Sequence, residues 1–250
     1  FKDDKNIDRV TLMGIIEDVF RNMIIKKYGS DDNFDIIVNP DKGDLEIWRN
    51  RIVVKDEDVE DSNAEIAYTD AVKIEPDFEV GEEVSEEVHL IDFGRRAILS
   101  LRQNLISRIQ EHDNTDLYNK YKELVGEIIS GEVHHIRNRE VIIIDDMDNE
   151  VILPKDQQIR SDFFRKGDTI RGVVKEVQLK GMKPRIVLSR TSPKFLERLF
   201  EQEIPEVADG LIIVKRVERI PGEKAKVAVE SYDERIDPVG ACVGMKGSRI

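Results

Sequence analysis

The chain has 250 residues, of which 40% are hydrophobic and 36% are charged. The apolar share is sufficient for buried cores, whereas the high charge favours several small domains over one large globule. The single cysteine excludes an internal disulfide, and the apolar runs are far shorter than the roughly 20 residues of a membrane helix. We therefore expect a cytoplasmic protein of up to three domains with no membrane partner.

The formal net charge of -13 is distributed unevenly along the chain. Residues 1–125 carry 17 basic and 30 acidic side chains, whereas residues 126–250 carry 22 of each. Within the second half, residues 160–194 hold 10 basic and 3 acidic side chains. Because salt screens charges beyond roughly 8 Å, local patches predict partners better than the total charge does. We expect a protein partner for the acidic half and a nucleic-acid partner for the other.

Residues 1–125 predict an α/β head with a long helix. Apolar residues near helical spacing run from Ile7 to Ile25, and Gly29 ends that helix. A turn is expected at residues 39–44, rich in residues that favour turn geometry. A long amphipathic helix should run from Phe93 to about Leu124, with a break at residues 113–115. The other expected elements are strands at 34–38, 45–54 and 86–91 and a short helix at 63–72.

Residues 126–191 change to short strands and regular turns. The five candidate strands occupy residues 128–136, 140–144, 150–153, 169–178 and 185–189. Five short strands in so short a segment predict a small closed barrel of the OB type, an architecture that often binds oligonucleotides. The acidic cluster at residues 145–150 lacks the glycine and the final glutamate of a calcium loop, so we interpret it as a solvated hairpin tip.

The basic run in the barrel supplies candidate phosphate contacts. These candidates are Lys180, Lys183, Arg185 and Arg190. An ordinary solvated barrel surface explains the same run equally well. Aromatic residues for base stacking are scarce, and the candidates are Phe163, Phe164, His134 and His135. Stacking adds about 1–3 kcal/mol per base, so we expect the barrel alone to bind RNA weakly.

The tetrapeptide Gly244-Met245-Lys246-Gly247 fits the GXXG loop of KH domains, which clamps a nucleic-acid backbone. Glycines let phosphate approach the main chain closely, and Lys246 adds charge. A tight turn is the commoner explanation of such a tetrapeptide. Here, however, it follows a helix at 193–202, strands at 211–219 and 225–229 and a short helical segment, the order of a type II KH module. Since the chain stops at Ile250, as the next helix should begin, we expect a truncated module.

Catalytic constellations are missing from the sequence. It has neither a GxxxxGK phosphate loop nor a Gly-x-Ser-x-Gly elbow, and the four histidines show no metal-ligand spacing with Cys242. Cys242 is expected to be a small buried residue in a packed helix. We therefore predict no cofactor and no enzymatic activity.

Four segments resemble bacterial transcription factors of the NusA family. Residues 192–210 resemble the junction between barrel and first KH module in that family, and residues 237–250 resemble its GXXG region. Residues 125–131 look like the start of its S1-type OB-fold, and residues 92–95 like the start of its long helix. The resemblance thus implies a multidomain α+β protein: an N-terminal domain (1–125), an S1-type barrel (126–191) and the start of a first, type II KH domain (192–250).

The resemblance also implies a function. The N-terminal domain of such factors docks on core RNA polymerase near the RNA exit channel, while the barrel and KH modules hold nascent single-stranded RNA. The factor promotes pausing and termination, and acts in the opposite sense in antitermination complexes with other Nus factors. Carried onto this chain, the RNA clamp falls on Gly244, Met245, Lys246 and Gly247, with Ser248 and Arg249 opening the next helix. The polymerase contacts within residues 1–125 stay unassigned.

Two other functions are compatible with a barrel beside a KH module. One is an accessory RNA-binding subunit of an RNA-processing enzyme, which would need a catalytic carboxylate or metal set that the sequence lacks. The other is a ribosome-associated RNA-binding protein.

Overall fold

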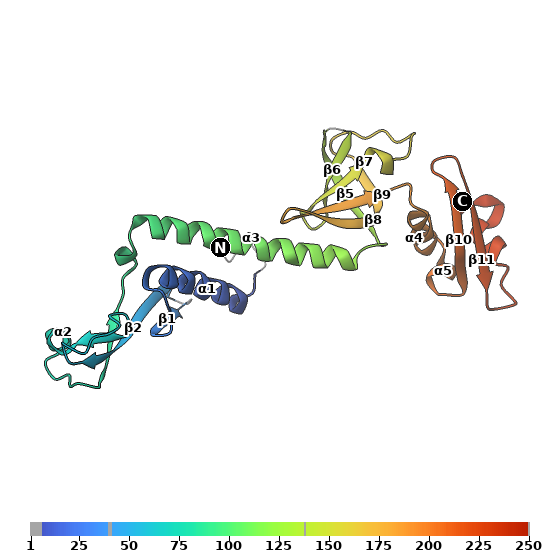
Figure 1. Ribbon diagram of the computed structural model, residues 1–250. Coiled ribbons are helices and arrows are strands. Elements are labelled where there is room, and N and C mark those ends of the chain that lie inside the picture. Colours follow the sequence, from blue (N-terminus) through green and yellow to red (C-terminus); the bar gives the residue numbers. More distant parts are fainter. Residues whose placement is uncertain (1–6, 40–41, 138, 250) are drawn as a thin grey trace. The chain divides into compact units, whose positions relative to one another are not determined.

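The computed structural model describes residues 7–39, 42–137 and 139–249 (Figure 1). The chain divides into two compact units, Phe1–Asp113 and Asn114–Ile250. The division lies inside a long helix, upstream of the boundary expected after residue 125. The predicted turn at 39–44 contains Pro40 and Asp41, which lie outside the described residues, as does Ile250.

The first unit begins with helix α1 (Arg9–Tyr28), which packs on a mixed sheet. Asp8 caps the helix, because its carboxylate accepts hydrogen bonds from the amides of Val10 (2.9 Å) and Thr11 (3.0 Å). The sheet is built from β1 (Phe34–Asn39), β2 (Asp44–Val54), β3 (Glu65–Ala67) and β4 (Glu83–Glu87). The long strand β2 pairs antiparallel with β1 and β4 and parallel with β3.

Two predictions for this sheet were wrong. The strand expected at 86–91 lies earlier, as β4, and residues Leu90–Phe93 form the short helix η1 instead. The helix expected at 63–72 begins only at Tyr68, as α2 (Tyr68–Ile74), because β3 takes the preceding residues into a parallel pairing with β2. Pairing with the distant strand β2 determines where β3 and β4 lie, and a local sequence pattern contains no information about such pairing.

Helix α3 (Arg95–Glu123) runs without interruption through the predicted break at residues 113–115. Asp, Asn and Thr lower helix propensity by only a few tenths of a kcal/mol each. Ile109 before the expected break and Tyr121 after it are both buried. Packing on either side therefore outweighs the weak local preference.

The second unit contains a closed barrel of five strands in the order β5-β6-β7-β9-β8, as the strand pattern predicted. The strands are β5 (Ile128–Arg137), β6 (Glu140–Asp145), β7 (Glu150–Pro154), β8 (Thr169–Lys180) and β9 (Lys183–Ser189), with the short helix η2 (Lys155–Gln157) after β7. Alternate residues point inward and fill the core. Tyr121, from the C-terminal end of α3, is fully buried in that same core.

The expectation of a solvated acidic tip was wrong for Asp145, which is only 5% exposed. Its carboxylate accepts hydrogen bonds from the Tyr121 hydroxyl and from the amides of Met147 and Asn149, both at 2.9 Å. Burial, and then Asp145, raise the pKa of Tyr121, which therefore stays a donor. Within the described ranges, no group of three or more His, Cys, Asp or Glu side chains could hold a metal ion. Asp145 is thus a structural acceptor at the turn.

After the barrel, helices and a hairpin form a small module. Its elements are α4 (Pro193–Glu203), α5 (Pro205–Ala208), β10 (Ile212–Ile220), β11 (Lys224–Ser231), α6 (Pro238–Val243) and η3 (Met245–Gly247). Ser192 caps α4, its hydroxyl accepting from the Lys194 amide at 3.2 Å. Cys242 is buried beside Ile204 and Ile212, as predicted, and this burial raises the pKa of its thiol.

Candidate nucleic-acid interface

The glycine loop (residues 244–247) leaves α6 through a backbone conformation that requires glycine. Gly244 has φ 70° and ψ 172°, a region that residues with a side chain essentially never occupy. A Cβ atom there would also lie 2.8 Å from the Ser248 hydroxyl oxygen and 2.9 Å from Cγ of Arg249. Lys246 (φ 55°) and Gly247 (φ 78°) continue in left-handed geometry. Both conformation and space therefore fix glycine at position 244.

The tip of this loop presents two side chains to solvent. Met245 is 89% exposed, and Lys246 is exposed as well. Behind the tip, the Ser248 amide donates to the Met245 carbonyl at 3.2 Å, and the Arg249 guanidinium donates to Glu206 Oε2 and the Ala241 carbonyl, both at 2.8 Å. Ser248 and Arg249 lie in a turn. Arg249 thus braces the loop, while Lys246 is presented outward.

The four predicted barrel contacts fall into two kinds. Lys180 and Lys183 face each other across the β8–β9 hairpin, beside the turn at Gly181, and both are exposed. Arg185 and Arg190 are half-buried and form ion pairs with Glu140 and Asp162. The structure therefore places two lysines at one exposed hairpin tip and two arginines within the barrel's own framework.

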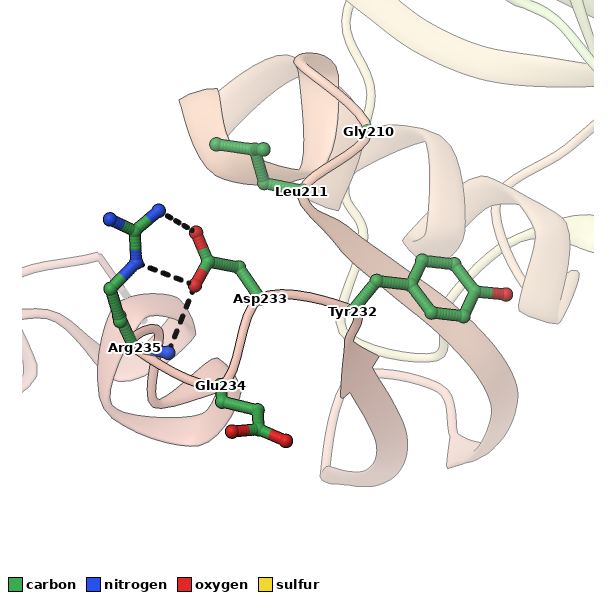
Figure 2. Close-up of a pocket in the computed structure, with 6 residues that line it drawn as sticks. All are labelled: Gly210, Leu211, Tyr232, Asp233, Glu234 and Arg235. Carbon is green, nitrogen blue, oxygen red and sulfur yellow. Dashed lines mark hydrogen bonds and ion pairs between the residues drawn. The ribbon is translucent and has the colours of Figure 1, made fainter.

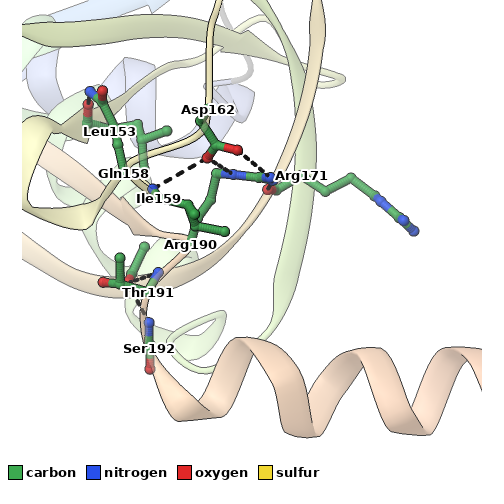
Figure 3. A network of polar contacts seen from close by, with 9 residues as sticks. Leu153, Gln158, Ile159, Asp162, Arg171, Arg190, Thr191 and Ser192 are labelled. Atoms are coloured by element: carbon green, nitrogen blue, oxygen red, sulfur yellow. Dashed lines mark hydrogen bonds and ion pairs between the residues drawn. The ribbon is translucent and has the colours of Figure 1, made fainter. Parts of the chain in front are cut away.

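Arg190 is the centre of a polar network at the end of the barrel (Figure 3). Its Nε donates to Asp162 Oδ2 and its Nη1 to the Arg171 carbonyl, both at 2.7 Å. The guanidinium carbon also lies 5.6 Å from the ring centre of Phe195, a residue of α4. Nearby, the Ser189 hydroxyl accepts from the amides of Thr191 (3.2 Å) and Ser192 (3.0 Å). The network therefore fixes the chain as it passes from β9 into α4.

Further contacts join the terminal module to the barrel. Arg198 of α4 donates from Nε to the Gly126 carbonyl at 2.9 Å, and its guanidinium forms an ion pair with Glu127, which directly precedes β5. At the turn of the β10–β11 hairpin, a Cβ atom on Gly222 would lie 2.4 Å from Cγ2 of Ile159. Because the Ile159 side chain lies so close to this turn, and because Gly222 has a positive φ of 81°, only glycine fits.

Sequence reasoning missed one exposed aromatic residue of the terminal module. Tyr232, which follows β11, is 73% exposed, and Lys215 Nζ lies 5.9 Å from its ring centre. Figure 2 shows Tyr232 beside a hollow that is also lined by Gly210, Leu211, Asp233, Glu234 and Arg235. A tyrosine in a polar turn shortly before the glycine loop was the available signal. In the barrel, Phe163 is exposed with Arg165 above it, whereas Phe164 packs against the core.

No helix in the part of the chain that the structure describes is long and apolar enough to cross a membrane.

The closed barrel and the helix–hairpin–helix module with its glycine loop define a protein of the mixed α+β class with several sheets. Residues 1–115 match the NusA N-terminal domain model, and residues 190–250 match the NusA-like first KH domain model. The chain therefore belongs to the NusA family.

Its similarity to curated relatives extends over nearly all of its length. The chain is 36% identical to transcription termination/antitermination protein NusA of Thermus thermophilus (89% of this chain, 57% of that protein) and 35% identical to that of Rickettsia prowazekii (99% and 48%). It is 30% identical to the Bacillus subtilis protein (99% and 66%). The solution structure of the N-terminal domain of NusA from B. subtilis covers 44% of this chain at 26% identity, with a TM-score of 0.32. The chain thus spans about half to two thirds of these relatives' length.

Proposed function

We propose that this chain is part of a cytoplasmic, non-enzymatic transcription factor that binds core RNA polymerase and nascent RNA and modulates pausing, termination and antitermination. One observation carries the proposal. A glycine loop with an exposed Met245–Lys246 tip lies in a segment similar to NusA-like first KH domains, on the same chain as a segment similar to NusA N-terminal domains.

The proposed work is divided among three modules. Residues 1–125 bind polymerase, residues 126–191 form an S1-type OB-fold, and residues 192–250 form a first KH domain of type II. The closed five-stranded barrel supports the second assignment, and the order α4, β10, β11, α6, glycine loop supports the third.

We assign the RNA contacts to the glycine loop, Ser248 and the lysine pair Lys180–Lys183. Phosphate can approach the main chain at the loop because Gly244 and Gly247 carry no side chain. Arg185, Arg190 and Arg249 support these contacts indirectly, since carboxylates already engage their guanidinium groups. Joining this RNA site to a polymerase site raises the effective concentration of each partner, provided that both can engage together. Other Nus factors would join the same assembly.

The double change Met245→Asp and Lys246→Asp tests the clamp in the full-length protein. Two carboxylates would face phosphate across the loop, so we expect RNA affinity to fall at least roughly tenfold, or about 1.4 kcal/mol, with polymerase binding unchanged. Filter binding with a single-stranded RNA and a polymerase pull-down measure the two effects. The matched control is Val80→Asp with Lys55→Asp, which also replaces one exposed apolar residue and one exposed lysine, in the head.

Three results would contradict the proposal. The first is unchanged RNA affinity in the loop variant, and the second is equal loss in the control variant. The third is a pull-down that enriches ribosomes and not polymerase, which would favour a ribosome-associated role.

A further inference from the structure

Among the residues that the structure describes, no helix packs on one face of the head sheet. Helix α1 packs on the side that carries Phe34 and Ile47. The residues that alternate with these point to the opposite side, and we call that side the outer face. Its central part, to which we restrict the name, consists of ten residues of β1, β2 and β4: Asp35, Ile37, Asp44, Glu46, Trp48, Asn50, Ile52, Glu83, Ser85 and Glu87. Strand alternation and the pairing register of β2 with β1 and β4 place all of them on one surface.

The outer face has a uniform charge. Five of these ten residues are carboxylates, and none of the ten is basic. The arginines of the same sheet lie on the other side, where the Arg49 guanidinium lies 5.0 Å from the Tyr28 ring centre and Arg51 pairs with Glu86. The negative charge of the outer face is therefore not neutralised within the sheet.

The outer face also exposes apolar groups in an ordered setting. Ile37 is 52% and Ile52 is 43% exposed, and between them lies the half-buried Trp48, whose indole Nε1 donates to Glu46 Oε2 at 3.0 Å. Across the strands, the side-chain Nδ2 of Asn50 donates to Asp35 Oδ2 (2.7 Å), and the Ser85 hydroxyl donates to Asn50 Oδ1 (2.8 Å). Hydrogen bonds that are already formed lower the ordering cost of binding, and tryptophan is a frequent anchor in protein interfaces.

Charge decides which occupant fits this surface. Carboxylates repel the phosphates of RNA and of anionic lipids, and they would repel the same face of a second copy. A protein segment that carries lysine or arginine beside apolar side chains complements both properties of the face.

We propose that the outer face docks a cationic amphipathic segment of a protein, with Trp48 as its central anchor. Because the inference rests on the proposed function, we assign that segment to core RNA polymerase. The exposed isoleucines would contact its apolar side chains, while the surrounding carboxylates pair with its basic groups.

Trp48 is the chain's single tryptophan, so its fluorescence reports directly on this surface. The probe is a tryptophan-free peptide of alternating lysine and leucine, and a peptide of alternating glutamate and leucine is its control. We expect only the lysine peptide to shift the Trp48 emission, and the shift to weaken in high salt. Absence of a shift, or an equal shift by both peptides, would overturn the proposal.

The double variant Ile37→Lys and Ile52→Lys removes the apolar contacts and reverses part of the charge. We expect the affinity for the lysine peptide and for core polymerase to fall at least roughly tenfold. The matched control is Ile74→Lys with Val80→Lys, in which two residues of similar exposure (48% and 52%) lie outside the outer face. Circular dichroism melts verify that both variants fold, and the control should stay within about twofold of the unaltered protein.

Two polymerase results separate this inference from the proposed function. If polymerase binds the unaltered chain and the outer-face variant equally well, the inference is wrong while the proposed function stands. If polymerase binds neither, while the lysine peptide still requires Ile37 and Ile52, then the proposed function fails and the outer face keeps its specificity for cationic segments.

Discussion

The outer face of the head and the basic run of the barrel are both charged surfaces, yet they use charge in opposite ways. On the outer face, the arginines of the sheet point away and leave the carboxylates to solvent. In the barrel, Arg185 and Arg190 pair with carboxylates of the same domain, and only part of the basic run stays available. A count of charged residues in the sequence therefore overestimates the positive charge that the barrel can offer to a ligand. For the outer face of the head, the same count agrees with the negative charge that is exposed.

The largest effect that tests this contrast concerns Arg190. Arg190→Ala removes the guanidinium donor from the Arg171 carbonyl and from the Asp162 carboxylate, which keeps only a longer hydrogen bond from the Ile159 amide at 3.3 Å. We therefore expect a loss of about 2–3 kcal/mol in the free energy of unfolding. Urea denaturation measures this loss. The control Arg165→Ala removes an exposed arginine above Phe163 and should cost less than about 0.5 kcal/mol. If Arg190→Ala changed RNA affinity but not stability, Arg190 would be a direct contact.

A smaller loss is expected when Tyr121→Phe removes one donor from buried Asp145. We expect about 1–2 kcal/mol at neutral pH, measured by urea denaturation. Because the pKa of Tyr121 is raised in the folded protein, this contribution should be complete at neutral pH and decline as the pH rises beyond about 10. Tyr118→Phe, in the same helix, is the control. Equal losses in the two variants would show that the bond to Asp145 is unimportant.

We expect the smallest effect, a modest loss of RNA affinity, when the two exposed lysines of the barrel hairpin are replaced. Lys180→Gln with Lys183→Gln should lower RNA affinity only severalfold at moderate salt. The slope of log K against log salt should decrease by about 1.4 if each lysine contacts one phosphate of a single strand. Titrations at several salt concentrations measure it, with Lys26→Gln and Lys55→Gln in the head as control. An unchanged slope would remove the hairpin tip from the RNA site.

The sequence predicted the elements that depend on local patterns. The alternation in the barrel strands and the order of elements before the glycine loop both depend on nearby residues, and the structure reproduces them. The position of Gly244 was predictable because few other residues tolerate its backbone angles. The RNA contacts themselves stay a prediction.

What could not be predicted depends on partners distant in the sequence. Arg185 meets Glu140 across 45 residues, and Asp145 is buried by Tyr121, which lies in a helix that precedes the barrel. The parallel pairing of β3 with β2 likewise overrides a helical pattern. A single sequence carries no signal for such long-range contacts. It therefore cannot distinguish a charged side chain that is exposed to solvent from one that forms an ion pair within the protein.

The contacts of Arg198 with Gly126 and of Gly222 with Ile159 fasten the glycine loop's module to the barrel within one compact unit. If the hairpin tip and the glycine loop both grip RNA, their spacing is then set by protein packing and not by the transcript. The protein would then favour transcripts in which the number of nucleotides between the two contacted segments matches the distance between the hairpin tip and the glycine loop. Its selectivity would be one of length as much as of base identity.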